Sequence, residues 1–172
     1  MPSSATPYRV APLGKIHDRE SFACGSVALD RYLQQQARQD AEKRVAAPFV
    51  LTEPPAARVL GYYTLSASVV NANELPEALA KKLPRYPQLP VTLIGRLAVD
   101  ASVKGRGIGQ FVLMDALRRS LGAAAQIAAM AVLVDAKDEA ADNFYRRFGF
   151  APLQQQPRRL FLPMRTIAGL FE

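Results

Sequence analysis

The sequence predicts a mixed α/β (α+β) fold, in which one central β-sheet of mixed strand direction is flanked by helices. Two observations predict this class. Segments whose apolar residues recur at helical spacing follow segments of strand-like alternation throughout the 172 residues. No internal repeat and no linker divides the chain, so that a single domain is expected.

The first predicted helix runs from Ser26, a good cap residue, to Arg44. Its apolar residues recur at every fourth position, at Leu29, Leu33, Ala37 and Ala41. Two strands follow at residues 48–53 and 58–70, and the sequence Pro-Pro-Ala-Ala between them favours a turn. This part of the chain therefore begins the sheet.

The middle of the chain predicts a helix, a loop, a strand and a second helix. The first helix is short and covers residues 74–83. Three prolines in residues 84–90 favour a constrained loop, because proline fixes φ and has no N–H to donate. The strand at residues 91–100 leads through a glycine cluster into a helix over residues 107–121, which should end at Gly122.

The last part of the chain predicts three more elements. The apolar run at residues 128–136 is typical of a strand that is buried on both faces. The next helix is capped by Asp138 and should end at Gly149, where a left-handed terminator belongs. A final strand is expected at residues 158–164.

The composition narrows the class of function. The formal net charge of +7 favours polyanionic partners or ligands that carry phosphate. A single cysteine, Cys24, and a single histidine, His17, exclude an internal disulfide and leave no plausible zinc cluster, so that no metal site is predicted and both residues should have ordinary packing or surface roles. Because neither a signal peptide nor an apolar run of about 18 residues is recognisable, we expect a soluble cytoplasmic protein without membrane contact.

The glycine cluster predicts an anion site. Gly105, Gly107 and Gly109 lie where a strand passes into a helix, and the first amides of that helix should be unpaired and accessible. Lys104 and Arg106 add positive charge. The spacing does not fit a dinucleotide-binding fingerprint, because the last glycine of that motif is absent from this sequence. It does not fit a Walker loop either, because no Gly-Lys-Ser/Thr follows. A simple glycine-rich turn would also account for the cluster.

The stretch from Lys104 to Gly109 resembles the pyrophosphate loop of the GNAT acetyltransferases, which follows the pattern Arg/Gln-x-x-Gly-x-Gly/Ala. Lysine stands at the first position, where the family has arginine or glutamine. About 35 residues further on, "DEAADNFYRRFGF" resembles a second segment of this family, with Asn143 and Tyr145 in the matching places. Two motifs on the expected elements make the resemblance much more specific than either motif alone.

This resemblance implies the GNAT acyltransferase fold over residues 10–166, with tails at residues 1–9 and 167–172. It also implies acetyl coenzyme A (acetyl-CoA) as the cofactor. The residues expected to bind it come from the strand before the loop, from the loop and from the later helix: Leu97, Ala98, Val99, Lys104, Gly105, Arg106, Gly107, Ile108, Gly109, Asn143 and Tyr145.

Longer stretches, among them "LGYYTLSAS", "LPRYPQLPVTLIGRLAVD" and "RRLFLPM", resemble the TacT-like GNAT toxins of bacterial type II toxin–antitoxin systems. The resemblance implies that the substrate is the α-amino group of an aminoacyl-tRNA, whose acetylation blocks translation. It further implies a ribbon-helix-helix antitoxin, contact with operator DNA only through that antitoxin, and a homodimer.

The chemistry of this reaction assigns roles to the residues. An α-amino group with a pKa near 8 is partly neutral at cellular pH, so that a strong base is unnecessary. We expect the backbone amide around Val99 to stabilise the oxyanion and Tyr145 to protonate the leaving thiolate as general acid. For the tRNA we expect contacts to phosphates and to the shape of the acceptor stem. The candidate residues are Arg85, Arg96, Lys81 and Lys82.

Two other functions stay open at this stage. One is a GNAT enzyme that acetylates a protein amine or a small-molecule amine, although the loop segments offer almost no carboxylates to attract a polyamine. The other is a coenzyme-binding or regulatory module without catalysis, against which the presence of Asn143 and Tyr145 argues.

Overall fold

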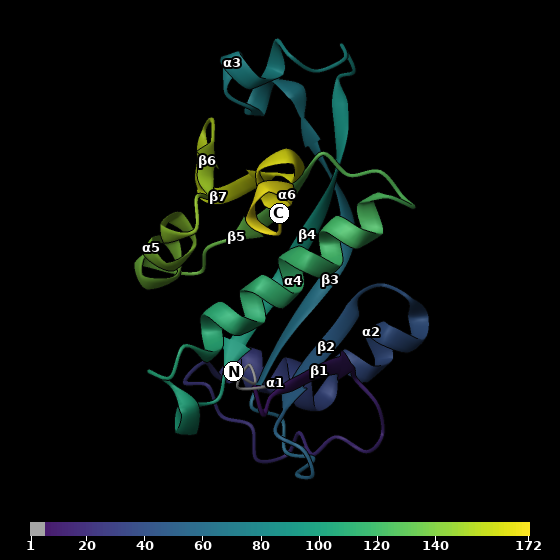
Figure 1. Ribbon diagram of the computed structural model, residues 1–172, viewed down its shortest axis with the longest axis vertical. Helices are drawn as coiled ribbons and strands as arrows, with labels where there is room; N and C mark the ends of the chain where they lie inside the picture. The colour runs from purple at the N-terminus through teal and green to yellow at the C-terminus, as the bar shows by residue number, and fades with distance from the viewer. Residues whose placement is uncertain (1–5) are drawn as a thin grey trace. The chain divides into compact units, whose positions relative to one another are not determined.

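The computed structural model describes residues 6–172 and contains a seven-stranded β-sheet (Figure 1). The strands are β1 (Arg9–Pro12), β2 (Ala47–Thr52), β3 (Gly61–Asn71), β4 (Gln88–Val99), β5 (Ala131–Asp135), β6 (Ala151–Leu153) and β7 (Gln156–Pro163). They pair in the order β1-β2-β3-β4-β5-β7-β6. Strands β4 and β5 are parallel, whereas β1–β2, β2–β3, β5–β7 and β6–β7 are antiparallel. The predicted mixed sheet is thus confirmed.

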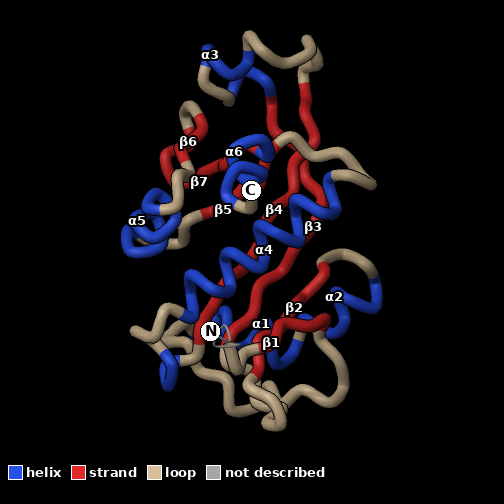
Figure 2. Tube along the Cα trace, in the orientation of Figure 1, coloured by secondary structure: helices blue, strands red, loops and turns tan. Residues whose placement is uncertain are grey.

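Helices connect many of these strands (Figure 2). The α-helices are α1 (Val27–Gln35), α2 (Ala37–Lys43), α3 (Glu77–Ala80), α4 (Ile108–Ala124), α5 (Glu139–Arg147) and α6 (Met164–Leu170). Two short 3₁₀ helices are η1 (Ala72–Glu74) and η2 (Ala101–Val103). In the part of the chain that the structure describes, no helix has the length and apolar character needed to cross a bilayer.

The chain is organised into two compact units, each with its own cluster of buried side chains. The first comprises the residues up to 65 together with 96–116, and the second comprises 66–95 with 117–172. Strands β3 and β4 and helix α4 each begin in one unit and end in the other. The core cluster of the first unit is Phe22, Cys24, Tyr32, Leu33, Ala37, Val50, Val59, Tyr62 and Ala98. The cluster of the second is Val70, Leu75, Leu89, Val91, Ala131, Leu133, Leu153 and Phe161.

In the first unit, the helix predicted over residues 26–44 is two helices. Ser26 caps α1 by accepting a hydrogen bond from the Leu29 amide, as its residue type predicts. Helix α1 ends at Gln35, because the φ and ψ of Gln36, −120° and −32°, lie outside the helical range, and α2 starts at Ala37. Leu33 and Ala37 remain buried on both sides of the break. Apolar spacing of four residues therefore cannot reveal a break that preserves the buried face.

In the second unit, the apolar run predicted as a doubly buried strand is β5. Its residues 131–134 are fully buried, and it lies between β4 and β7 in the sheet. Figure 2 shows the β6–β7 hairpin followed by α6. The sequence pattern predicted β7 but not the three-residue β6, which is too short to show a periodicity.

Several predicted boundaries differ from the observed ones. Strand β4 begins at Gln88, inside the predicted proline loop. Proline has no N–H, but the carbonyl of Pro90 accepts a hydrogen bond from the Met130 amide at 2.9 Å. Helix α4 does not end at Gly122 but continues through it to Ala124. At the chain ends, β1 starts within the predicted tail 1–9, and α6 extends into the predicted tail 167–172 with Ile167 buried. Strand β1 is held by its antiparallel pairing with β2, and α6 is held by its buried apolar residues, so that both terminal segments are regular.

Candidate active site

The end of strand β4 carries the first predicted coenzyme residues. Ala98 belongs to the core of the first unit, while Leu97 and Val99 alternate with it and are half-buried. This is the pattern of a strand with one face on the core. The backbone of these residues leads directly to the glycine loop.

Asp100, which the sequence analysis did not select, anchors the start of that loop. Its side chain is only 2% exposed and accepts hydrogen bonds from the Ala23 amide (2.9 Å) and from the Ser102 amide and hydroxyl (3.0 and 2.6 Å). Arg58 forms an ion pair with it at 3.1 Å. Burial acts to raise the pKa of Asp100, but the hydrogen bonds from Ser102 and Ala23 and the charge of Arg58 outweigh this effect and hold the pKa below its ordinary value.

Replacing Asp100 with asparagine should lower the free energy of unfolding at pH 7 by about 1–3 kcal/mol, because one of its two oxygens becomes an NH₂ group, which would face the donors either of Ala23 or of Ser102. A depressed folded-state pKa means that the carboxylate stabilises the protein above its ordinary pKa of 3.8 and loses this effect as the pH falls through the folded-state value. Urea unfolding of both proteins at pH 7 and at about pH 3 tests this, and the difference between them should shrink at acid pH.

The control for this experiment is Glu42→Gln. The Glu42 side chain is 69% exposed, and its ion pair with Arg38 is 3.7 Å long, so that its loss should change the free energy of unfolding by less than about 0.5 kcal/mol. A stability difference for Asp100→Asn that stays the same at both pH values would contradict the role assigned to the carboxylate.

The glycine loop follows and opens helix α4. Gly105 and Gly107 have φ angles of 82° and 76°, in the left-handed region that residues with a Cβ disfavour. An ideal Cβ at either position would meet no atom within 4 Å, so that both glycines present bare backbone to open space. Ile108 is buried and Gly109 is half-buried in the first turn of α4. The amides of that turn lack carbonyl partners within the helix, and this arrangement suits an anion.

The two cations of the loop differ in their partners. The Lys104 ammonium donates a hydrogen bond to the carbonyl of Cys24. Arg106 is exposed, and no hydrogen bond or ion pair involves its guanidinium within residues 6–172. Arg106 therefore has all of its donors available for a ligand, whereas Lys104 connects the loop to the segment that precedes α1.

Cys24 and His17 occupy structural positions. Cys24 is buried in the core of the first unit. His17 is half-buried and accepts a hydrogen bond at Nδ1 from the Gly14 amide at 2.9 Å, which closes a turn. Both placements agree with the predicted packing roles. Among the residues that the structure describes, no group of three or more His, Cys, Asp and Glu side chains is placed to hold a metal ion.

Helix α5 in the second unit carries Asn143 and Tyr145. Asp138 caps it by accepting from the Ala141 amide at 2.8 Å, as predicted. Tyr145 is 7% exposed, and its ring meets Phe150 edge to face with centroids 5.5 Å apart. Burial raises the pKa of Tyr145, so that its phenol stays protonated at cellular pH. Asn143 is exposed and lies about 200° around the helix from Tyr145.

Three of the four basic residues predicted to contact tRNA lie in the second unit, between α3 and β4. Lys81 is exposed and pairs with Glu77 at 3.4 Å. Lys82 and Arg85 are also exposed. The fourth, Arg96, lies on β4 in the first unit. The structure therefore groups three of these residues and gives Arg96 separate surroundings.

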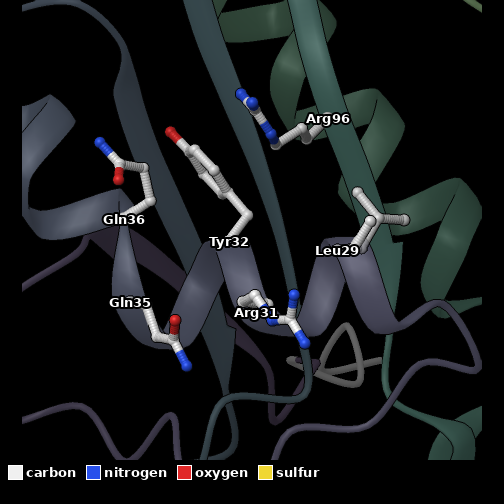
Figure 3. Close-up of a pocket in the computed structure, with 7 residues that line it drawn as sticks. Leu29, Arg31, Tyr32, Gln35, Gln36 and Arg96 are labelled. Atoms are coloured by element: carbon white, nitrogen blue, oxygen red, sulfur yellow. The ribbon is translucent and has the colours of Figure 1, made fainter.

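Arg96 lines a pocket of about 410 Å³ with residues of helix α1 and the α1–α2 junction (Figure 3). The lining residues are Ala28, Leu29, Arg31, Tyr32, Gln35, Gln36 and Arg96. The Arg96 Cζ atom lies 3.5 Å from the centroid of the Tyr32 ring, in a cation–π contact. The sequence pattern did not predict this pocket.

A hydrogen-bond network holds the Tyr32 ring in place. Its phenol donates to Asp40 Oδ2 at 2.7 Å, and Gln36 donates to Asp40 Oδ1 at 2.9 Å. Burial and the bond to Asp40 raise the pKa of Tyr32, whereas the bonds from Gln36 and Tyr32 lower the pKa of Asp40. Asp40 is therefore ionised and Tyr32 neutral at cellular pH. Both oxygens of the carboxylate already have donors within this network.

Comparisons with known proteins identify the family. A family model for the acetyltransferase (GNAT) domain matches residues 56–152. The probable toxin TacT of Sinorhizobium fredii is 30% identical over 161 residues, which are 90% of this chain and 89% of that protein. The tRNA-acetylating toxin of Mycobacterium tuberculosis is 34% identical over 170 residues, which are 99% of this chain and 98% of that protein.

Solved structures agree with these relatives. A tyrosine-to-phenylalanine variant of KacT has a TM-score of 0.90 and 31% identity, covering 95% of this chain and 99% of that chain. AtaT complexed with acetyl-methionyl-tRNAfMet has a TM-score of 0.89 and 30% identity, with coverages of 96% and 99%. AtaTR bound with acetyl-CoA has a TM-score of 0.84 and 30% identity, with coverages of 96% and 98%.

Other structures of these toxins contain protein or DNA partners. AtaT bound to the C-terminus of the antitoxin AtaR has a TM-score of 0.83 and 28% identity, with coverages of 96% and 99%. The KacTA–DNA complex has a TM-score of 0.80 and 28% identity, with coverages of 95% and 98%. The family match, the identity over almost the whole chain and the shared fold confirm the predicted resemblance, and the chain belongs to the GNAT acetyltransferase family, among the toxins of the TacT, KacT and AtaT type.

Proposed function

We propose that this chain is a toxin that transfers the acetyl group of acetyl-CoA to the α-amino group of an aminoacyl-tRNA. The observation that carries the proposal is the similarity over nearly the whole chain to a tRNA-acetylating toxin and to AtaT in complex with acetylated methionyl-tRNA. An acetylated amine has lost the basic lone pair that attacks the growing peptide. Such a product would stop translation.

The glycine loop fits the pyrophosphate of coenzyme A. Gly105 and Gly107 present bare backbone to open space, and the amides of the first turn of α4 together with Arg106 supply hydrogen-bond donors and charge. The backbone of residues 97–99 would hold the pantetheine arm, as the family resemblance implies. Acetyl-CoA supplies a thioester, an acyl group activated for attack by an amine.

Tyr145 is the proposed general acid, and Asn143 a proposed cofactor contact on the same helix. The phenol oxygen of Tyr145 holds a proton throughout the physiological range because burial raises its pKa. In its protonated form Tyr145 can donate this proton to the leaving thiolate as the C–S bond breaks, and the phenolate regains a proton from the substrate nitrogen, which loses one as the amide forms. The α-amino group of the substrate is partly neutral at cellular pH, so that no strong base is required from the protein.

The positive charge of the chain supports binding of RNA, and the similarity to AtaT supports binding of an antitoxin. Lys81, Lys82 and Arg85 are exposed on one segment and are proposed to contact tRNA phosphates. Because AtaT binds the antitoxin AtaR and KacTA binds DNA, we also propose that a ribbon-helix-helix antitoxin neutralises this chain and connects it to operator DNA. A homodimer that works in the cytoplasm, where charged tRNA is found, completes the proposal.

The test is acetylation of bulk tRNA by the purified protein. Aminoacylated tRNA and acetyl-CoA are incubated with the protein, and the nuclease-released 3′-terminal aminoacyl-adenosines are analysed by mass spectrometry. We expect N-acetylated aminoacyl ends, and deacylated tRNA should give none. Acetyl transfer to a small polyamine or a protein lysine, with unmodified aminoacyl ends in the same reaction, would overturn the proposal.

A further inference from the structure

The pocket beside helix α1 contains the Arg96 guanidinium stacked on the Tyr32 ring, a contact that takes no part in the pyrophosphate loop. The Tyr32 ring is nearly buried and stacks with the Tyr62 ring at 6.3 Å between centroids, with 15° between their planes. The half-buried Arg96 guanidinium lies over Tyr32 at 3.5 Å. Of the two stacked groups Arg96 and Tyr32, the guanidinium is thus the more exposed, and it lines the pocket (Figure 3).

The donors of Arg96 are unused. Within residues 6–172, its guanidinium takes part in no hydrogen bond or ion pair, although a guanidinium carries five N–H donors. The nearby carboxylate of Asp40 is already engaged by Tyr32 and Gln36. The Arg96 guanidinium therefore contacts a ring face and feels the charge of Asp40 without a hydrogen bond to it, so that its N–H edge stays available for a ligand.

The lining of the pocket defines the chemistry of that ligand. Arg31 and Arg96 contribute two positive charges, Gln35 and Gln36 contribute carboxamides, and no carboxylate lines the pocket. Guanidinium planes stack on nucleobases, amides bond to base edges, and arginine attracts phosphate. An unpaired nucleotide combines a flat ring, a polar edge and a negative charge, and it matches all three features of this pocket.

We infer that the Arg96–Tyr32 stack is a platform on which the unpaired 3′-terminal base of the substrate tRNA lies. This inference rests on the proposed function for the identity of the RNA. The accepted amino acid is esterified to the terminal ribose, so that the terminal base is the base closest to the reacting amine along the covalent chain. The Tyr32–Asp40 bond positions the platform, and Arg31 and the two glutamines contact the rest of the nucleotide.

The experiment uses deacylated tRNA in which 2-aminopurine replaces the terminal adenine. Stacking quenches the fluorescence of this base, and a titration gives both the quenching and the affinity. We expect quenching by the native protein. Arg96→Lys keeps the charge but removes the plane, and it should abolish the quenching and weaken binding on the order of tenfold, a change typical of losing a stacked base.

Arg38→Lys is the matched control, because Arg38 lies on α2, pairs with Glu42 and does not line the pocket. It should bind and quench like the native protein. Thermal unfolding of both variants verifies that they are folded. A titration at several salt concentrations adds a second readout: the salt dependence should be the same for Arg96→Lys and the native protein, because the charge is kept.

Three results would overturn the platform: no quenching by the native protein, full quenching by a folded Arg96→Lys, or equal losses in both lysine variants. Full quenching by Arg96→Lys would indicate a simple phosphate contact. Deacylated tRNA has no amine to acetylate, so that this titration is independent of the reaction. Quenching without acetylation would refute the proposed function alone, and acetylation without quenching would refute the platform alone.

Discussion

Tyr145→Phe should reduce the turnover number for tRNA acetylation by about 10²–10⁴-fold and leave the affinity for acetyl-CoA unchanged within about twofold. The substitution removes only the phenol oxygen, so that the ring still packs against Phe144 and Phe150. Without the proton donor, the leaving thiolate must be protonated by water. Steady-state acetylation assays and calorimetric titration of acetyl-CoA separate these two quantities.

The pH dependence provides a second readout for the same residue. Because the pKa of Tyr145 is raised above its ordinary value of 10, the acid form persists across the range in which the substrate amine loses its proton. The rate should therefore rise with pH through the titration of the amine and should not fall again below about pH 10. Tyr86→Phe, at a site 64% exposed, serves as the matched control and should behave as the native protein. Unchanged turnover in Tyr145→Phe would remove this tyrosine from the mechanism.

Gly107→Val should weaken acetyl-CoA binding by at least about tenfold. The φ angle of 76° is costly for a β-branched residue, and this strain is on the order of 1–3 kcal/mol. The new Cβ would meet no protein atom within 4 Å, so that the side chain would fill the space in front of the loop instead of disturbing the core. Calorimetry with acetyl-CoA measures the change, and thermal unfolding measures the strain separately.

Gly122→Ala is the matched control for that substitution. Gly122 also belongs to the α4 region, but it is exposed within the helix, and its added Cβ would likewise meet no atom. Alanine there should leave acetyl-CoA binding unchanged and should stabilise the protein by up to about 1 kcal/mol. Native affinity in Gly107→Val would refute the assignment of this loop to the pyrophosphate.

The sequence correctly predicted those elements that depend on residues close together along the chain. The continuous apolar run became β5, Asp138 became the cap of α5, and Gly105 and Gly107 adopt positive φ angles just before the start of α4. In each case the deciding residues lie within a few positions of one another. The break at Gln36 was not predictable, because the residues on either side of it keep the same buried face.

The parts of the site that sequence reasoning missed depend on residues far apart in the chain. Arg96 was predicted as a phosphate contact, but the Tyr32 ring beneath it comes from a helix more than 60 residues earlier. Asp100 was not selected, because its main partners are amides and a hydroxyl, one of them 77 residues away. Periodicity and motifs describe neighbours along the chain, and they contain no information on such pairings.

Two hydrogen bonds should connect coenzyme binding with hydrogen exchange in a distant part of the chain. Lys104 donates one to Cys24, and the Ala23 amide donates the other to Asp100. They join segments separated by 80 and 77 residues at the two ends of the turn that leads into the glycine loop. A ligand that binds this loop only when it is closed must also favour the ordered state of residues 23–25. Acetyl-CoA should consequently slow hydrogen exchange at the amide of Ala23, a group in a segment that the coenzyme need not touch.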